Sequence, residues 1–135
     1  LGLGENVRFL GEKRREEVAA ILPCCDVGFI PFDDDPIWLS AYTTKLFEYA
    51  ASGLPTIVSV MKGADLEKLV NENRVGHVVE PLNHEQVAMA IMTVCQNKKE
   101  LEQMRMNARR LATEEFSRER IANRLAELLQ AKSQA

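Results

Sequence analysis

The sequence predicts an α/β protein, a parallel Rossmann-like sheet with flanking helices. Short apolar runs alternate along the chain with segments of helical period, in the order strand, helix, strand, helix, strand, helix, strand and then three helices. One run, Thr56 to Val60, is almost wholly β-branched and begins after Gly53 and Pro55. The 135 residues are 46% hydrophobic and 27% charged, which is typical of a single globular domain with one core.

Four apolar runs predict the strands, at 7–10, 27–32, 56–60 and 76–79. The run at 27–32 is nearly all apolar, which indicates a strand buried on both faces. Four strands are few for a doubly wound sheet, so we expect further strands of this domain upstream of the first.

The helices follow from apolar spacing and from capping residues. A helix around 18–25 ends near Pro23, and a helix at 44–51 ends at Gly53, with a short helix around 66–70 after it. Asn83 and Gln86 predict a capping box, and Ser117 caps the last helix. The faces expected inside are Val18, Ile21, Leu22 and Cys25; Val87, Ala90, Ile91 and Val94; Leu101, Met104, Ala108 and Leu111; and Ile121, Leu125 and Leu128.

Charge and cysteine content exclude several classes of protein. The formal charge is −3, from 17 basic and 20 acidic residues, which argues against a nucleic-acid partner. Cys24, Cys25 and Cys95 form neither an even set nor a metal motif, so we interpret them as core residues in a reducing compartment. Neither a secretion signal nor a membrane-spanning run is present, and we expect a cytoplasmic location.

The segment from Ser40 to Glu48 is the best candidate site, because ligands of parallel sheets bind beyond the carboxyl ends of the strands. Ser40 to Lys45 offers hydroxyls and free backbone N–H groups at a helix N-terminus, where phosphates bind. The carboxylate of Glu48, one turn further along the helix, can accept hydrogen bonds from the two hydroxyls of a ribose. The spacing also fits a simple structural interpretation, in which Thr44 caps the helix and Glu48 complements its dipole.

Several segments together resemble the group-one glycosyltransferases of the GT-B fold. They are Asn6 to Gly11, Cys25 to Val27, Lys45 to Ser59 and Glu115 to Ser117. The similarity runs from about Asn6 to about Leu129, and Lys45 to Ser59 is its most specific part. The resemblance implies that residues 1–135 are the later part of the C-terminal, nucleotide-sugar-binding domain, without its first strands and without the N-terminal acceptor domain.

The resemblance also implies roles for individual residues. Glu48 matches the second glutamate of the family's pair, which holds the ribose hydroxyls of the donor. Tyr42, Thr43 and Thr44 match the loop whose backbone amides meet the distal phosphate. Ser40 stands where the first glutamate is expected, so the contact to the donor sugar differs here.

The function implied is donor binding in a retaining glycosyltransferase of cell-surface polysaccharide or glycolipid synthesis. The substrate is a nucleoside diphosphate sugar, and neither cofactor nor metal is implied. The implied partners are the donor, the N-terminal domain of the same enzyme and, through a lipid-linked acceptor and residues such as Arg109 and Arg110, the inner face of a membrane. We expect the 135-residue chain alone to be inactive.

Two other functions are compatible with a parallel α/β domain of this length. A non-catalytic α/β interaction module, without nucleotide binding, stays open. A phosphoacceptor signalling domain is disfavoured, because the acidic cluster Asp33 to Asp35 follows the second predicted strand and no matching lysine is present.

Other chemically suggestive residues have simpler interpretations. The Asp33 to Asp35 cluster suits a solvated turn better than a metal site. Trp38 covers a ligand ring or rests on the sheet. His77 is interpreted as structural, and Lys98, Lys99, Arg105, Arg109 and Arg110 as solvated helix faces.

Overall fold

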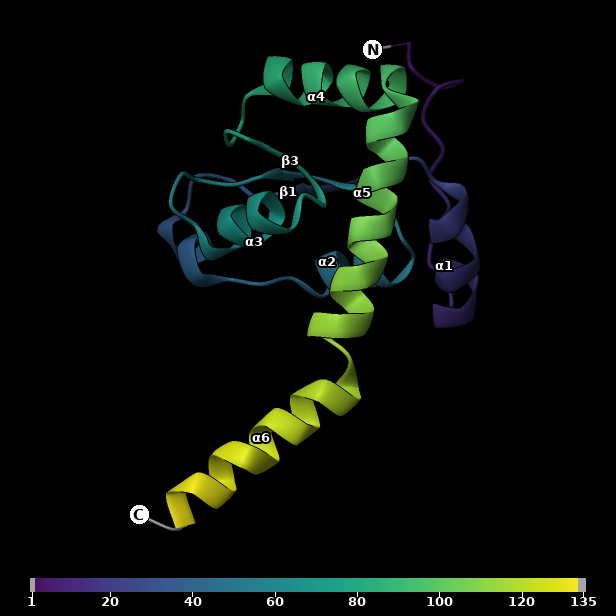
Figure 1. The fold of residues 1–135 in the computed structure, drawn as a ribbon. Helices are drawn as coiled ribbons and strands as arrows, with labels where there is room; N and C mark the ends of the chain where they lie inside the picture. The colour runs from purple at the N-terminus through teal and green to yellow at the C-terminus, as the bar shows by residue number, and fades with distance from the viewer. Residues whose placement is uncertain (1, 134–135) are drawn as a thin grey trace.

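A computed structural model describes residues 2–133 and confirms the α/β class (Figure 1). The sheet has three parallel strands, β1 (Gly28–Pro31), β2 (Thr56–Ser59) and β3 (Gly76–Val79), in the order β1-β2-β3. The register pairs Ile30 with Val58, and Val58 with Val78. Successive strands therefore always step in the same direction across the sheet.

Helices cover both faces of this sheet. The two crossovers contain α2 (Thr44–Ala51), which packs on β1, and α3 (Asp65–Asn73), which packs on β3. Both lie on the same face (Figure 1), as right-handed crossovers stepping in one direction require. The other face carries α4 (His84–Gln96), which contacts β2 and β3.

The core lies between the sheet and the crossover helices. Val58 on β2 is fully buried, and Leu46 and Leu66 from the two crossover helices are at most 1% exposed. All four residues of β2 are buried, because this strand has a neighbour on each side and helices on both faces. The remaining buried apolar residues of this cluster are Ile30, Ala50, Val60, Ala64, Leu69, Val70, Val75, Ala108 and Leu111.

Helix α5 (Lys98–Arg110) runs along the end of the sheet at which the strands begin (Figure 1). Arg105 Nη2 donates to the carbonyl of Cys25 at 3.0 Å, and Asn107 Nδ2 donates to the carbonyl of Arg74 at 3.0 Å. Cys25 precedes β1 and Arg74 precedes β3, so α5 ties the two segments together. Its buried face of Met104, Ala108 and the following Leu111 confirms the prediction, and Leu101 is half-buried.

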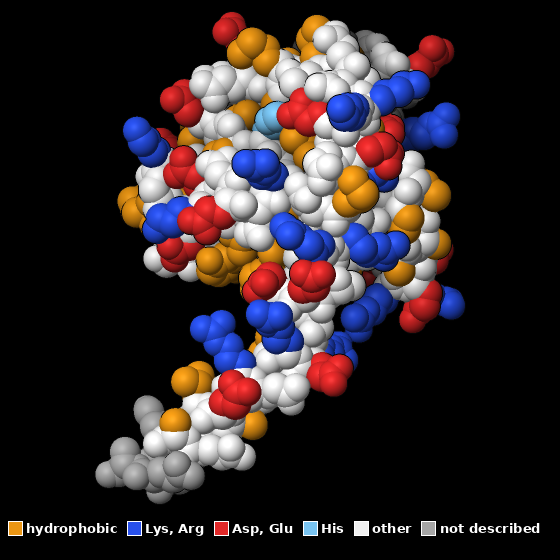
Figure 2. Space-filling view, in the orientation of Figure 1, with side chains coloured by type: hydrophobic (Ala, Val, Ile, Leu, Met, Phe, Trp, Pro, Cys, Tyr) orange, Lys and Arg blue, Asp and Glu red, His pale blue; other side chains and the backbone are white. Residues whose placement is uncertain are grey.

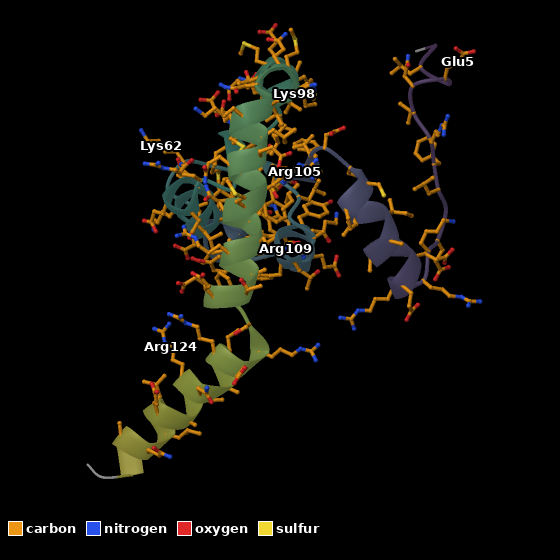
Figure 3. All side chains as sticks on the ribbon, turned by 45° about the vertical axis from the view of Figure 1, so that its right-hand side comes forward. Glu5, Lys62, Lys98, Arg105, Arg109 and Arg124 are labelled. Atoms are coloured by element: carbon orange, nitrogen blue, oxygen red, sulfur yellow. The ribbon has the colours of Figure 1, made fainter. Side chains whose placement is uncertain are left out.

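Two of the five basic residues of α5 bond to neighbouring segments, whereas Lys98, Lys99 and Arg110 are exposed, as predicted. Arg109 Nη1 donates to the carbonyl of Ala51 at 2.9 Å, and Arg105 also lies 3.6 Å from Asp26. Figure 3 shows Arg105 and Arg109 one turn apart on the same helix. Arg105 is half-buried, so the prediction that it is solvated is wrong, and Arg109 is exposed but also donates to a carbonyl on a neighbouring segment, which the prediction missed.

The predicted strand at 7–10 is absent from the structure. These four residues have no regular structure and are all exposed, with Phe9 at 95% exposure. Within the described residues β1 pairs only with β2, so the segment reaches no strand to pair with. Apolar pattern predicts the tendency to form a strand, but a strand also needs a neighbour that accepts its hydrogen bonds.

The predicted strand at 27–32 is shorter and only partly buried. Strand β1 alternates between buried and exposed residues, and Phe29 is 39% exposed, because β1 is an edge strand among the described residues. The expectation of a strand buried on both faces is therefore wrong.

The expectation of core cysteines is also wrong, since Cys24 and Cys95 are exposed and Cys25 is half-buried.

The helix boundaries largely confirm the capping signals. Helix α1 (Arg15–Ile21) passes into a 3₁₀ turn, η1 (Leu22–Cys24), at Pro23, but none of its residues is fully buried. Asn83 caps α4 through the N–H of Gln86 at 3.0 Å. Gln86 does not complete a capping box, because its side chain instead accepts from the N–H of Glu80 at 2.8 Å. Ile91, expected inside on α4, is 40% exposed.

The last helix, α6 (Arg118–Ser133), extends away from the rest of the molecule after a π-helical turn, η3 (Leu111–Glu115) (Figure 1). Ser117 caps α6 by accepting from the N–H of Arg120 at 3.2 Å, as predicted. Ile121, Leu125 and Leu128 are 51–59% exposed, so the expectation that they face inward is wrong. Figure 2 shows apolar side chains open along this helix.

Candidate functional site

The candidate site is built on the segment that joins the carboxyl end of β1 to α2. Its first residue, Phe32, is fixed to the end of β2 by two hydrogen bonds. The N–H of Phe32 donates to the carbonyl of Ser59 at 3.1 Å, and the Ser59 hydroxyl donates to the carbonyl of Phe32 at 2.9 Å. Because Ser59 is 4% exposed, the segment leaves the sheet from a rigid point.

The segment then folds back on itself through Asp33. The Asp33 Oδ1 atom accepts from the N–H of Asp35 at 3.2 Å and from the Trp38 indole N–H at 2.5 Å. The Trp38 ring stacks on Phe32, with centroids 4.3 Å apart and planes 4° apart. Asp35 accepts from the N–H of Ile37 at 2.9 Å and so caps a 3₁₀ turn, η2 (Pro36–Ser40). The turn interpretation of the acidic cluster is confirmed, and Trp38 rests on Phe32.

Helix α2 begins one residue earlier than the capping interpretation assumed. Thr43 is the N-cap, with its Oγ1 atom accepting from the N–H of Lys45 at 3.3 Å, so Thr44 is the first helical residue rather than the cap. Within the described residues the backbone N–H groups of Tyr42, Thr43 and Thr44 donate to nothing. These groups are the donors that a helix N-terminus presents to an anion.

Glu48 lies just over one turn into α2, two positions beyond the third helical residue that a capping box uses. Its side chain is exposed, and within the part of the chain that is described its carboxylate takes part in no hydrogen bond or ion pair. Leu46 and Ala50 on the opposite side of α2 are buried, which fixes the direction in which Glu48 points. Glu48 is therefore not engaged in capping its own helix.

Tyr49 fixes α2 against β1. A Cβ atom added at Gly28 would lie 2.5 Å from Cδ2 of the Tyr49 ring, so the ring occupies the space over this glycine. Burial raises the pKa of the Tyr49 phenol, and electrostatic interactions with Glu48 and Cys25 raise it further. The phenol thus remains neutral beside Glu48 at any physiological pH.

An aromatic cluster supports the other side of α2. Phe47 lies 4.9 Å from Phe116 and 6.4 Å from Tyr42, between ring centroids. Tyr42 and Phe116 also line a groove of about 300 Å³ beside Leu69 of α3. Tyr42 is nevertheless 51% exposed, so it remains accessible to a ligand.

All five predicted site residues lie on one continuous segment of the chain, from η2 into α2. Ser40 ends η2 and is exposed, Tyr42 and Thr43 follow it, and Thr44 and Glu48 lie on exposed positions of α2. Sequence reasoning missed the part played by Asp33 and Trp38 in shaping this segment. An acidic side chain five residues before an indole is a weak signal, and only the folded turn shows that they meet.

Free backbone donors at the start of a crossover helix can bind an anion, and ligands of parallel sheets are found at this end of the strands. The family model described as glycosyl transferases group 1 matches residues 1–111, and the chain belongs to this family. The family description gives the general activity as the transfer of glycosyl groups, which requires a sugar donor and an acceptor. A comparison with curated proteins found no match to this chain. Across residues 2–133, the helices are too short or too polar to cross a membrane.

Proposed function

We propose that this chain binds the nucleoside diphosphate sugar of a retaining glycosyltransferase. The observation that carries the proposal is the set of unengaged polar groups around the start of α2. They are the N–H groups of Thr43 and Thr44 and, one turn on, the exposed carboxylate of Glu48. The family membership supports a sugar donor as the ligand.

In this proposal each group has a chemical task. The N–H groups and the dipole of α2 hold the distal phosphate, and they stabilise the charge that the diphosphate gains as the glycosyl bond breaks. Lys45, exposed at the second helical position, adds a positive charge beside them. Glu48 accepts hydrogen bonds from the two ribose hydroxyls, and Ser40, which the family resemblance aligns with a glutamate, contacts the donor sugar.

The wider biological setting belongs to the same proposal. The acceptor is a precursor of cell-surface polysaccharide or glycolipid, held by an N-terminal domain outside residues 1–135. The enzyme works in the cytoplasm, at the inner face of the membrane where a lipid-linked acceptor lies. The charge and the fold of this chain are compatible with these assignments, which rest on the family resemblance.

Ser40 favours one competing function, a non-catalytic interaction module. A serine in place of an acidic residue removes a strong acceptor of sugar hydroxyl groups. In that case water satisfies the exposed N–H groups and Glu48, and no nucleotide binds.

Calorimetric titration of the chain with UDP and GDP separates the two functions. We expect one nucleotide to bind, and Glu48→Gln to weaken it about tenfold, as expected for lost hydrogen bonds to a charged group. Glu85→Gln is the matched control, because Glu85 is an exposed glutamate in the first turn of α4. Absence of binding to the unmodified chain, or equal affinity of both variants, would contradict the proposed function.

A further inference from the structure

We infer that Asp33 is a positioning residue for the donor-binding segment, and that it acts through Trp38. In this inference Asp33 keeps residues 40–43 in the conformation in which their backbone N–H groups are available to a ligand. The consequence for nucleotide affinity rests on the proposed function. The effect on the conformation of the segment is independent of that function.

The donor-binding segment begins at a fixed point, Phe32. Phe32 makes two hydrogen bonds to Ser59 at the end of β2, of 3.1 Å through its N–H and 2.9 Å through its carbonyl. The Phe32 ring is thereby held at the carboxyl end of the sheet. It is the surface on which Trp38 stacks.

The Asp33 carboxylate closes the turn between Phe32 and Trp38. Stacking alone leaves an indole free to slide or rotate in its plane, but the Asp33 Oδ1 atom accepts the Trp38 N–H at 2.5 Å. The same oxygen accepts the N–H of Asp35 at 3.2 Å. One carboxylate therefore fixes both the backbone of the turn and the rotation of the indole. Hydrogen bonds to a carboxylate are stronger than those between neutral groups.

Few contacts other than the polar turn and the stacked indole keep η2 in place. Ile37 is 68% exposed and Leu39 is 38% exposed, so apolar burial contributes little to the order of η2. Ser40, which ends η2, is also exposed. The position of Ser40 therefore depends on the polar turn and the stacked indole, although η2 also touches α3.

Trp38 is close in the sequence to the residues proposed to bind the ligand. Ser40 is two residues after Trp38, and Thr43, the N-cap of α2, follows three residues later. A segment that is already ordered does not lose conformational entropy when a ligand binds, whereas a mobile one does. Loss of the Asp33 bond should therefore weaken a ligand that Asp33 never touches.

Four variants of the 135-residue chain test the inference. Asp33→Ala removes both hydrogen bonds, Asp33→Asn keeps an acceptor oxygen, and Trp38→Phe keeps the stack without the N–H donor. Asp34→Ala is the matched control. It removes the same charge from the same turn, and Asp34 is exposed and, among the described residues, makes no hydrogen bond.

The first readout needs no ligand. We expect amide hydrogen exchange at Ile37, Trp38 and Lys45, whose N–H groups are hydrogen-bonded within the turn and the helix cap, to be at least about fivefold faster in Asp33→Ala, with β2 amides unchanged. Acrylamide quenching of Trp38, the only tryptophan in the chain, should rise in parallel. Asp33→Asn should restore most of the protection, and Trp38→Phe should be intermediate. Equal exchange in Asp33→Ala and Asp34→Ala would overturn the inference.

The second readout is UDP affinity. We expect Asp33→Ala to bind about tenfold more weakly, the size of effect expected for hydrogen bonds to a carboxylate, and Asp34→Ala to bind normally. If the unmodified chain binds UDP and Asp33→Ala binds it equally well, the inference is wrong while the proposed function stands. If the unmodified chain binds no nucleotide, the proposed function fails, and hydrogen exchange still decides the role of Asp33.

Discussion

Individual contacts explain why particular residue types occur around α2. Gly28 leaves the space that the Tyr49 ring fills, since an added Cβ atom would lie 2.5 Å from Cδ2 of that ring. The Tyr49 phenol is partly shielded from water, which raises its pKa. Electrostatic interactions with Glu48 and Cys25 raise this pKa further. The packing that orients α2 therefore also depends on Tyr49 remaining neutral.

The raised pKa of Tyr49 makes stability depend on alkaline pH. The unfolded phenol loses its proton near its ordinary value of 10.0, whereas the folded phenol holds it to higher pH. The stabilisation is complete below pH 10 and is lost as the pH rises through the folded pKa. Urea unfolding of wild type between pH 8 and 11 should show this loss, and Tyr49→Phe should show a smaller one. Tyr42→Phe, which alters the other, exposed tyrosine, should match wild type; identical curves for all three proteins would contradict this assignment.

At the scale of elements, α5 joins segments that are distant in the sequence. Its polar side chains donate to the carbonyls of Cys25 and Ala51, which lie before β1 and at the end of α2, and to that of Arg74 after α3. The last carbonyls of a helix lack partners within the helix, so Arg109 completes the end of α2. Helix α5 thus fixes the amino end of the sheet, and the loops at the carboxyl end remain available for a ligand.

We expect Arg109→Ala to lower the free energy of unfolding by about 1 kcal/mol, the usual net value of one hydrogen bond. The matched control is Arg110→Ala, since Arg110 is the next residue, is exposed and, among the described residues, has no partner for its side chain. Urea denaturation of both variants measures the difference. Equal losses would show that the bond to Ala51 contributes nothing.

At the scale of the whole molecule, α6 stands apart from the core. Every side chain described from Arg118 to Ala131 is exposed. The apolar stripe of Ile121, Leu125 and Leu128 therefore lies open along the helix, next to Arg124. The core ends instead at Phe116, whose ring packs on Phe47 at 4.9 Å.

A chain shortened to end at Phe116 should therefore keep its fold. We expect its free energy of unfolding to equal that of the full chain within about 0.5 kcal/mol, because the exposed Arg120–Glu115 pair at 3.7 Å is worth little. Phe116→Ala in the full chain should instead cost about 2 kcal/mol, through the lost aromatic packing. Urea denaturation compares the two. A strongly destabilised short chain would show that α6 contributes to the core.

Much of the candidate site was predictable, because its residues are neighbours in the sequence. Tyr42, Thr43, Thr44 and Glu48 lie within seven residues, so once a helix is placed there their relation is set by helical geometry. The N-cap was misplaced by one residue, since Thr43 and Thr44 both suit that position and only backbone conformation distinguishes them. The roles proposed for these residues remain predictions.

The sequence by itself determined the α/β class, the three strands within the predicted runs and most helix ends, because local periodicity, β-branching and capping carry that information. Tertiary structure alone decided which segments found partners. The run at 7–10 has strand composition but no strand beside it. Cys24, Cys95 and the stripe of α6 are apolar but exposed. Asp33 meets Trp38 only when the turn closes. Burial and pairing depend on what lies opposite a residue, which its own neighbours in sequence do not specify.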